Sequence, residues 1–113
     1  MSAPSFDPVI HPPVRLQVMA VLVNVQDAEF ATLRDMAQVS DSVLSKHLSA
    51  LVEVDYIRLR KAAANGRQRT WAAVTRAGRA AFEHHVAALK QLAGLAEGIS
   101  PDRAGAEASP AAG

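Results

Sequence analysis

The sequence predicts a single domain that is mainly α-helical and carries one small β-hairpin, an α+β fold. Three observations predict it. The 113 residues suffice for one domain. Most of the larger apolar residues recur at helical spacing, whereas residues 57–74 alternate between apolar and polar side chains on either side of Asn65-Gly66. The hydrophobic half of the composition is mostly Ala, Val and Leu, so we expect a core of small aliphatic groups.

The composition excludes several kinds of site and compartment. The chain has no cysteine, which excludes disulfides, thiolate metal sites and cysteine nucleophiles. Its first residues lack the basic start and long apolar run of a signal peptide. The longest apolar stretch, residues 18–23, is far too short to span a bilayer. We therefore expect a cytoplasmic protein with no membrane partner.

Charge is unevenly distributed along the chain, although the net charge is only +1. Residues 1–56 hold three Lys or Arg against seven Asp or Glu, and residues 57–90 hold eight against one. Between Arg58 and Arg79 there is no acidic residue. Such a block is typical of a surface that faces an anion, and a solvated basic hairpin is the alternative.

The first helix is expected to begin at Pro12-Pro13, after a flexible arm of residues 1–10 that contains two prolines. Its apolar residues continue to about Val25 and occupy most of the circumference. Such a helix must be covered from two directions. In so small a chain, we expect the second cover to be another subunit.

Two further helices are expected before the hairpin. Residues 27–30 form a connector with room for a short strand. Thr32 and Asp35 resemble a capping box and predict a short helix to about Gln38. After a tight break, Ser40 is expected to cap a helix that runs to about Val54.

The helix expected at residues 41–54 has two distinct faces. Its apolar stripe comprises Leu44, His47, Leu48 and Leu51. The opposite face carries Ser42, Ser45, Lys46 and Ser49. Small hydroxyl side chains and one cation suit close docking on an anionic surface rich in acceptors, such as the DNA major groove. An ordinary amphipathic helix with a serine-rich exterior is the alternative. Two short helices joined by a turn, the second with such a face, form a helix-turn-helix pattern.

The alternating segment is expected to fold into a hairpin about Asn65-Gly66. Its inward side chains would be Ile57, Leu59, Thr70, Ala72 and Val74. Its outward side chains would include Arg58, Arg60, Arg69 and Trp71. The hairpin would therefore carry a cluster of cations near its tip.

A last helix is expected from Thr75, which caps it, to about Glu97. Its apolar stripe comprises Phe82, Val86, Leu89, Leu92, Ala93 and Ala96. Residues 98–113 are rich in Ala, Gly, Pro and Ser and predict a disordered tail. The folded domain is thus expected to span residues 11–97.

This order of elements is that of a winged helix-turn-helix, and the sequence resembles the small bacterial transcriptional regulators of the MarR and ArsR type. The recognition-helix region of that group resembles residues 39–61, VSDSVLSKHLSALVEVDYIRLRK. The segment NGRQRTWAAVTRAGR, residues 65–79, resembles its wing and the Thr-x-x-Gly-Arg start of its last helix. The similarity covers about residues 11–93.

The resemblance implies a homodimeric regulator, expected to be a repressor, that binds a palindromic operator in double-stranded DNA. The second helix of the motif would enter the major groove, and the wing would touch phosphates or the minor groove. The implied groove-facing residues are Ser40, Asp41, Ser42, Val43, Ser45 and Lys46. The implied wing residues are Lys61, Asn65, Gly66, Arg67 and Arg69. N- and C-terminal helices would form the dimer interface through Val18, Leu22, Phe82, Val86, Leu89 and Leu92.

Asp41 departs from the amide or small residue often found at its position in that group. Its carboxylate could accept from a cytosine amine, or it could favour the N-terminus of the helix. Trp71 and the seam between the first and last helices could border a pocket for a small-molecule effector. Trp71 could equally pack against a partner helix.

A metal site, a cofactor and catalysis are not expected. The histidines are His11, His47, His84 and His85, and no thiol accompanies them. The adjacent pair His84 and His85 point about 100° apart on a helix, so the two cannot readily chelate one ion, and we expect a solvated or interface role for both. His47 matches a histidine of the family but lies on the apolar stripe, so we interpret it as a packed core residue.

Catalysis by the serines of the third helix is disfavoured because Ser42 and His47 lie on different helix faces and nothing supplies an oxyanion site. No glycine-rich phosphate loop follows a strand. The remaining rival function is a winged helix that binds another protein without specific DNA binding. Such a module would more often show an apolar patch beside the third helix.

Overall fold

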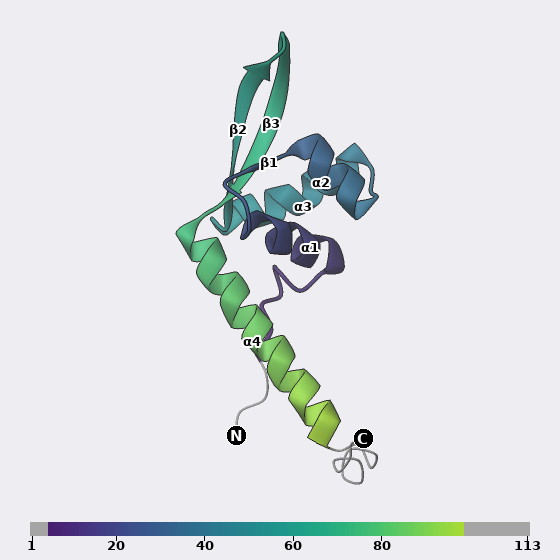
Figure 1. The fold of residues 1–113 in the computed structure, drawn as a ribbon, viewed down its shortest axis with the longest axis vertical. Helices are drawn as coiled ribbons and strands as arrows, with labels where there is room; N and C mark the ends of the chain where they lie inside the picture. The colour runs from purple at the N-terminus through teal and green to yellow at the C-terminus, as the bar shows by residue number, and fades with distance from the viewer. Residues whose placement is uncertain (1–4, 99–113) are drawn as a thin grey trace, which may run out of the picture.

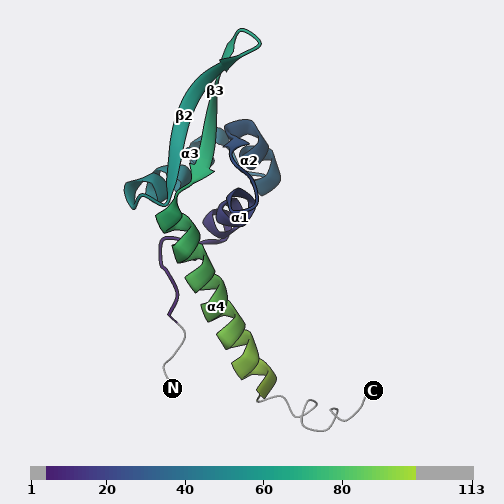
Figure 2. The ribbon, with the colours of Figure 1, turned by 60° about the vertical axis from the view of Figure 1, so that its left-hand side comes forward.

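The computed structural model describes residues 5–98, which form four helices and a three-stranded antiparallel sheet (Figure 1). The elements are α1 (Pro13–Leu22), β1 (Ala28–Glu29), α2 (Phe30–Ala37), α3 (Asp41–Glu53), β2 (Ile57–Ala64), β3 (Arg67–Val74) and α4 (Arg76–Gly98). The strands lie in the order β1-β3-β2. The three short helices gather at the base of the β2–β3 hairpin, which projects in one direction while α4 extends in the other (Figures 1 and 2). This arrangement confirms the α+β winged helix-turn-helix.

The core lies between the short helices and the base of the hairpin. Its fully buried apolar side chains are Ile10, Val18, Met19, Leu22, Leu33, Leu44, Leu48, Leu51 and Ile57. Two of them, Val18 and Leu22, were expected in a dimer interface and are 0 % exposed within a single chain. That expectation was wrong for both, because α1 contacts α2, α3, α4 and β3 of its own chain. The apolar circumference of α1 is thus covered largely from within.

Two helix caps and the hairpin turn form as the sequence predicted. Ser40 Oγ accepts a hydrogen bond from the Val43 N–H at 3.2 Å and caps α3. Thr75 Oγ1 accepts from the Gly78 N–H at 2.9 Å at the start of α4. The hairpin turn has φ of 53° at Asn65 and 76° at Gly66, as a type I′ turn requires.

The capping box expected at Thr32 and Asp35 was wrong. Helix α2 begins at Phe30, and Thr32 lies inside it. The strand β1, which pairs with β3 through Ala28 and Glu29, leads directly into the helix. Glu29 therefore occupies the N-cap position and makes no capping hydrogen bond with its side chain.

Leu59 was expected to face inward and is instead 42 % exposed. The alternation of β2 does place Leu59 on the same side as the buried Ile57. Beyond the base of the hairpin, however, the helices no longer cover that side. Leu59 therefore lies on an open surface rather than in the core.

The described part of the N-terminal segment is packed rather than loose. Ile10 is fully buried, and residues 5–11 lie beside α4 (Figure 2). His85 of α4 is 0 % exposed against this segment, so the expected solvated or interface role was wrong for His85, whereas His84 is exposed. The expected tail lies outside the described residues, apart from Gly98. Among residues 5–98, no helix combines the length and the apolar character that crossing a membrane requires.

Candidate nucleic-acid interface

The polar face of α3 is open to solvent along its whole length. The six groove-facing positions are all exposed in the structure: Ser40, Asp41, Ser42, Val43, Ser45 and Lys46. Helix α3 is anchored from the opposite side, where its three leucines are buried. Because short side chains dominate the exposed face, its backbone can approach another surface closely.

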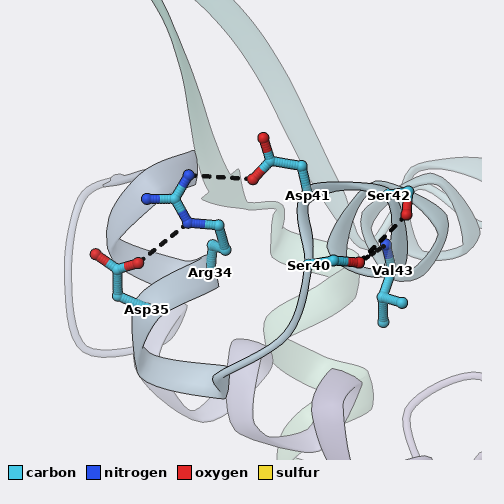
Figure 3. A network of polar contacts seen from close by, with 6 residues as sticks. All are labelled: Arg34, Asp35, Ser40, Asp41, Ser42 and Val43. Atoms are coloured by element: carbon cyan, nitrogen blue, oxygen red, sulfur yellow. Dashed lines mark hydrogen bonds and ion pairs between the residues drawn. The ribbon is translucent and has the colours of Figure 1, made fainter.

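The third helix is tied to the second by one arginine, Arg34 of α2 (Figure 3). Arg34 Nη1 lies 3.1 Å from Asp41 Oδ1, and Arg34 Nε lies 3.0 Å from Asp35 Oδ1. The hydrogen bonds to Asp41 and Asp35 raise the pKa of Arg34 above its usual value. The structure thus gives Asp41 a partner within the chain, and its carboxylate partly neutralises a cation at the edge of the exposed face.

Sequence reasoning missed Arg34. It lies seven residues before Asp41 on a different helix, and only the turn between them brings the two side chains together. That turn depends on Gln38, which ends α2 in the left-handed region with φ 57°. A basic residue in the helix before the capping serine was the available signal, but nothing in the spacing specified its partner.

The wing presents four of the five expected residues at its surface. Lys61, Asn65, Gly66 and Arg67 are exposed, and within residues 5–98 the side chains of Lys61 and Arg67 form no ion pair. Arg69 is placed differently. It is half-buried, and its Nη1 lies 2.8 Å from Glu29 Oε2. Arg69 therefore joins β3 to β1 by an ion pair in the free protein.

Two more cations of the basic block are also engaged. Arg60 pairs with Asp27 at 2.7 Å, and its guanidinium lies 5.5 Å from the centre of the Trp71 ring. Arg79 Nη1 donates to the Val23 carbonyl oxygen at 2.9 Å. The acid-free run of sequence is thus partly neutralised by acids from the first half of the chain. The cations left for an external anion are concentrated on β2 and at the hairpin tip.

A groove of about 640 Å³ separates α3 from β2. Its lining comprises Ser45, Lys46, Ser49, Ala50, Val52, Glu53 and Leu59. A smaller hollow beside it brings Ser45 and Ser49 together with Lys61 and Thr70. The serine face of α3 and the wing therefore border one concave surface, although they are separated in sequence.

His47 of α3 contacts α1 and serves packing. Its Nδ1 accepts a hydrogen bond from Arg15 Nε at 3.0 Å, and the ring is half-buried. Burial, with a smaller contribution from the charge of Arg15, lowers the pKa of His47. The position agrees with a packed histidine rather than a surface ligand.

A second hollow, of about 470 Å³, lies between the end of α1 and α4. Its lining includes Val23, Arg79, Phe82, Val86 and Lys90. Trp71 is not part of this lining. The volume of this hollow is in the range of small-molecule sites.

The expected dimer residues of α4 lie along one stripe. Phe82, Val86 and Leu89 are half-buried, and Leu92 is 47 % exposed, as is Leu95 one turn further on. In both views the second half of α4 extends away from the body of the domain (Figures 1 and 2). This half of the helix therefore presents leucines that residues 5–98 of its own chain do not cover.

Comparison with known proteins agrees with this geometry. Residues 14–93 match the model of a family described as a winged helix DNA-binding domain. The chain is 30 % identical over 79 residues to the uncharacterised protein MJ0432 of Methanocaldococcus jannaschii, covering 70 % of this chain and 86 % of that protein.

Solved structures share the fold. A transcriptional regulator homologue from Pyrococcus horikoshii superposes with a TM-score of 0.71 at 23 % identity, over 76 % of this chain and 85 % of that one. HlyU from Vibrio cholerae superposes with a TM-score of 0.54 at 20 % identity, over 66 % of this chain and 77 % of that one. These neighbours share the winged helix fold that the resemblance to transcriptional regulators implied. The chain belongs to the winged helix DNA-binding domain family.

Proposed function

We propose that the protein is a homodimeric, sequence-specific transcriptional regulator, acting as a repressor, that binds a palindromic operator in double-stranded DNA. One observation carries the proposal. The slim, hydroxyl-rich face of α3 borders the same concave surface as the wing, whose Lys61 and Arg67 have no ion-pair partner in the described structure. Hydroxyls and close backbone approach suit base edges, and free cations suit phosphates.

In this proposal α3 enters the major groove with its N-terminal half foremost. Ser42 and Lys46 lie on its exposed face, four residues apart, where both can reach base edges. The N-terminus of α3 also favours a phosphate, although Asp41 reduces that attraction. At this end of the helix the ion pair with Asp41 occupies the cation of Arg34 from α2.

The hairpin would lie over the adjacent phosphates or in the minor groove. Arg67 is placed at the tip by the Asn65-Gly66 turn, and Lys61 lies on β2 opposite Thr70. Neither side chain is held by an ion pair within residues 5–98, so we expect both to contribute charge more than base selectivity.

The proposed dimer uses α4. Leu92 and Leu95 are exposed on the part of α4 that leaves the body of the domain, and Phe82, Val86 and Leu89 continue the same stripe. A second copy is the occupant we propose, because the family resemblance implies a two-fold dimer. Such a dimer would present two α3 helices about 34 Å apart, one turn of DNA. The site that we propose for a small-molecule effector is the α1–α4 hollow.

One observation favours a second candidate function, the binding of another protein. Val52 and Leu59 are about two-fifths exposed in the groove beside α3 and form a small apolar surface there. Footprinting of the protein on the DNA that flanks its own gene separates the two candidates. The DNA-binding proposal predicts protection of a two-fold symmetric site, and a protein-binding module would protect none.

A further inference from the structure

The N-terminal clasp, which we define as residues 5–11, is attached to α4 through His85. The Asp7 N–H donates a hydrogen bond to His85 Nδ1 at 3.0 Å. The other ring nitrogen of His85, Nε2, lies 3.3 Å from His11 Nδ1. The Phe6 ring stacks on His11 and meets His85 edge-on, with centroid distances of 5.0 and 5.5 Å. The only fully buried charged or polar residue of the described chain is thus enclosed by its own N-terminal segment.

The carboxylate of Asp7 attaches the clasp at a second point. Asp7 Oδ2 accepts a hydrogen bond from the Tyr56 hydroxyl at 2.6 Å, and Oδ1 accepts from the Val9 N–H at 2.8 Å. The bond to Asp7, together with burial, raises the pKa of Tyr56 to about 12. Burial opposes the charge on Asp7, but the hydrogen bonds from Tyr56 and the backbone outweigh it, so the pKa of Asp7 is lowered. Asp7 therefore stays ionised and Tyr56 protonated throughout the neutral and mildly acidic range.

The hydrogen bonds of His85 require its neutral form. Because Nδ1 accepts from the Asp7 N–H, it carries no proton, and the single ring proton lies on Nε2, facing His11. Adding a second proton would place two N–H donors, those of Nδ1 and Asp7, against each other. The same step would bury a positive charge beside His11.

We propose that the clasp is a proton-sensitive strap, in which protonation of His85 breaks its bond to Asp7 and releases residues 5–11 from α4. The proposal goes beyond DNA binding and does not depend on it. Release would uncover the face of α4 that carries His85 and the buried Ala88.

The charges around His85 determine the pH at which release occurs. Burial is the largest effect and lowers the pKa of His85, and His11 and then His84 lower it further, whereas the carboxylate of Asp7 raises it. The net direction is downward from 6.5. The folded clasp therefore binds fewer protons than the released one, and its stability is complete above that value and falls as the pH falls below it.

The paired nitrogens of His11 and His85 do not indicate a metal site. Within residues 5–98, no group of three His, Cys, Asp or Glu side chains is placed to hold an ion. The Nδ1 of His85 is also directed at a backbone donor rather than at open space. The geometry therefore points to proton binding.

Hydrogen exchange of the Asp7 amide, followed by NMR on the full chain, tests the proposal. Protection, corrected for the intrinsic effect of pH on exchange, should be high at about pH 7.5. It should then fall by up to about tenfold per pH unit as the pH falls from 6.5 to the lower midpoint of His85. The ring carbon signals of His85 should titrate over the same pH range, with a midpoint below 6.5. Constant protection down to about pH 5, or a loss that follows His11, His47 or His84 instead, would overturn it.

Two variants sharpen the test. His85→Asn places an amide oxygen near the position of Nδ1, so it can accept from Asp7 but cannot be protonated in this range, and its Asp7 protection should not depend on pH. His84→Gln removes the exposed neighbouring histidine and should leave the pH dependence in place. A pH-independent His84→Gln protein would contradict the assignment to His85. If His85→Asn does not fold, the agreement in the wild-type protein between the loss of Asp7 protection and the titration range of His85 decides.

Discussion

Arg34 of α2 holds Asp41, the first residue of α3, by an ion pair of 3.1 Å that crosses the turn of the helix-turn-helix. Arg34 is partly exposed, at 35 %, and Asp41 is exposed, at 69 %, so the pair contributes little to global stability. Its effect is local. It places a cation at the edge of the α3 face and compensates the only acidic charge in the first turn of that helix.

Replacing Asp41 by Asn should strengthen binding to DNA of any sequence. The change removes a negative charge that faces phosphates and frees Arg34 to contact one. The plot of log affinity against log salt should become steeper by up to about one unit per added phosphate contact. Asp35→Asn removes the other partner of Arg34 on α2 and should have a smaller effect. Weaker non-specific binding by Asp41→Asn would contradict this account of the pair.

Gly78 should not tolerate a side chain, because a Cβ at this position would overlap the carbonyl group of Tyr56. Gly78→Ala should lower the free energy of unfolding by about 1–3 kcal/mol or more, as overpacking against backbone does. Gly94, on the same helix, has open space where a Cβ would lie. Gly94→Ala should raise stability by about 0.5–1 kcal/mol through helix propensity. Urea unfolding of both variants measures the difference, and equal effects would show that the approach of α4 to Tyr56 is not tight.

Arg67 and Arg69 should differ although both are wing arginines. Arg67→Ala should weaken binding to operator and scrambled DNA alike and flatten the salt dependence by about one unit per lost phosphate contact, doubled in a dimer. Arg69→Ala breaks the half-buried pair with Glu29 and should lower the free energy of unfolding by roughly 1 kcal/mol. Thermal unfolding and a salt series on the two proteins check this. An unfolding loss in Arg67→Ala instead would reverse the assignment.

Leu92→Asp should dissociate the proposed dimer without unfolding the chain, because Leu92 is 47 % exposed. A buried carboxylate in an apolar interface has no compensating partner. Ala80→Asp is the control, since Ala80 is exposed on α4 about 180° around the helix from Leu89. Sedimentation at micromolar concentration should give a dimer for the wild type and for Ala80→Asp and a monomer for Leu92→Asp. A monomeric wild type would remove the dimer from the proposal.

Periodicity and caps were enough to predict the order of elements. Ser40, Thr75 and Asn65-Gly66 act locally, within three residues, so their roles could be derived from the sequence alone. The packing partners of α1 could not be predicted in this way. Whether Val18 and Leu22 face a partner or their own core depends on how α3 and α4 fold back, which is a tertiary property.

The same limit applied to charges and to the N-terminal segment. The pairs of Arg60 with Asp27 and of Arg69 with Glu29 join residues 33 and 40 positions apart. The sequence therefore did not show that these two cations of the basic block are ion-paired. His85 appeared as one of two adjacent helix histidines. Its burial depends on Asp7, 78 residues earlier in the chain.

The central claim is that α3 reads the bases and the wing supplies charge, and one competition titration tests it most directly. Wild-type, Ser42→Arg and Arg67→Ala proteins are titrated with operator DNA in the presence of scrambled DNA at several salt concentrations. Ser42→Arg should reduce the preference for operator more than it changes non-specific affinity, because a bulky side chain blocks close docking of α3. Arg67→Ala should keep the preference and lose affinity for both DNAs. Unchanged affinity and preference in Ser42→Arg, with altered base preference in Arg67→Ala, would contradict the claim.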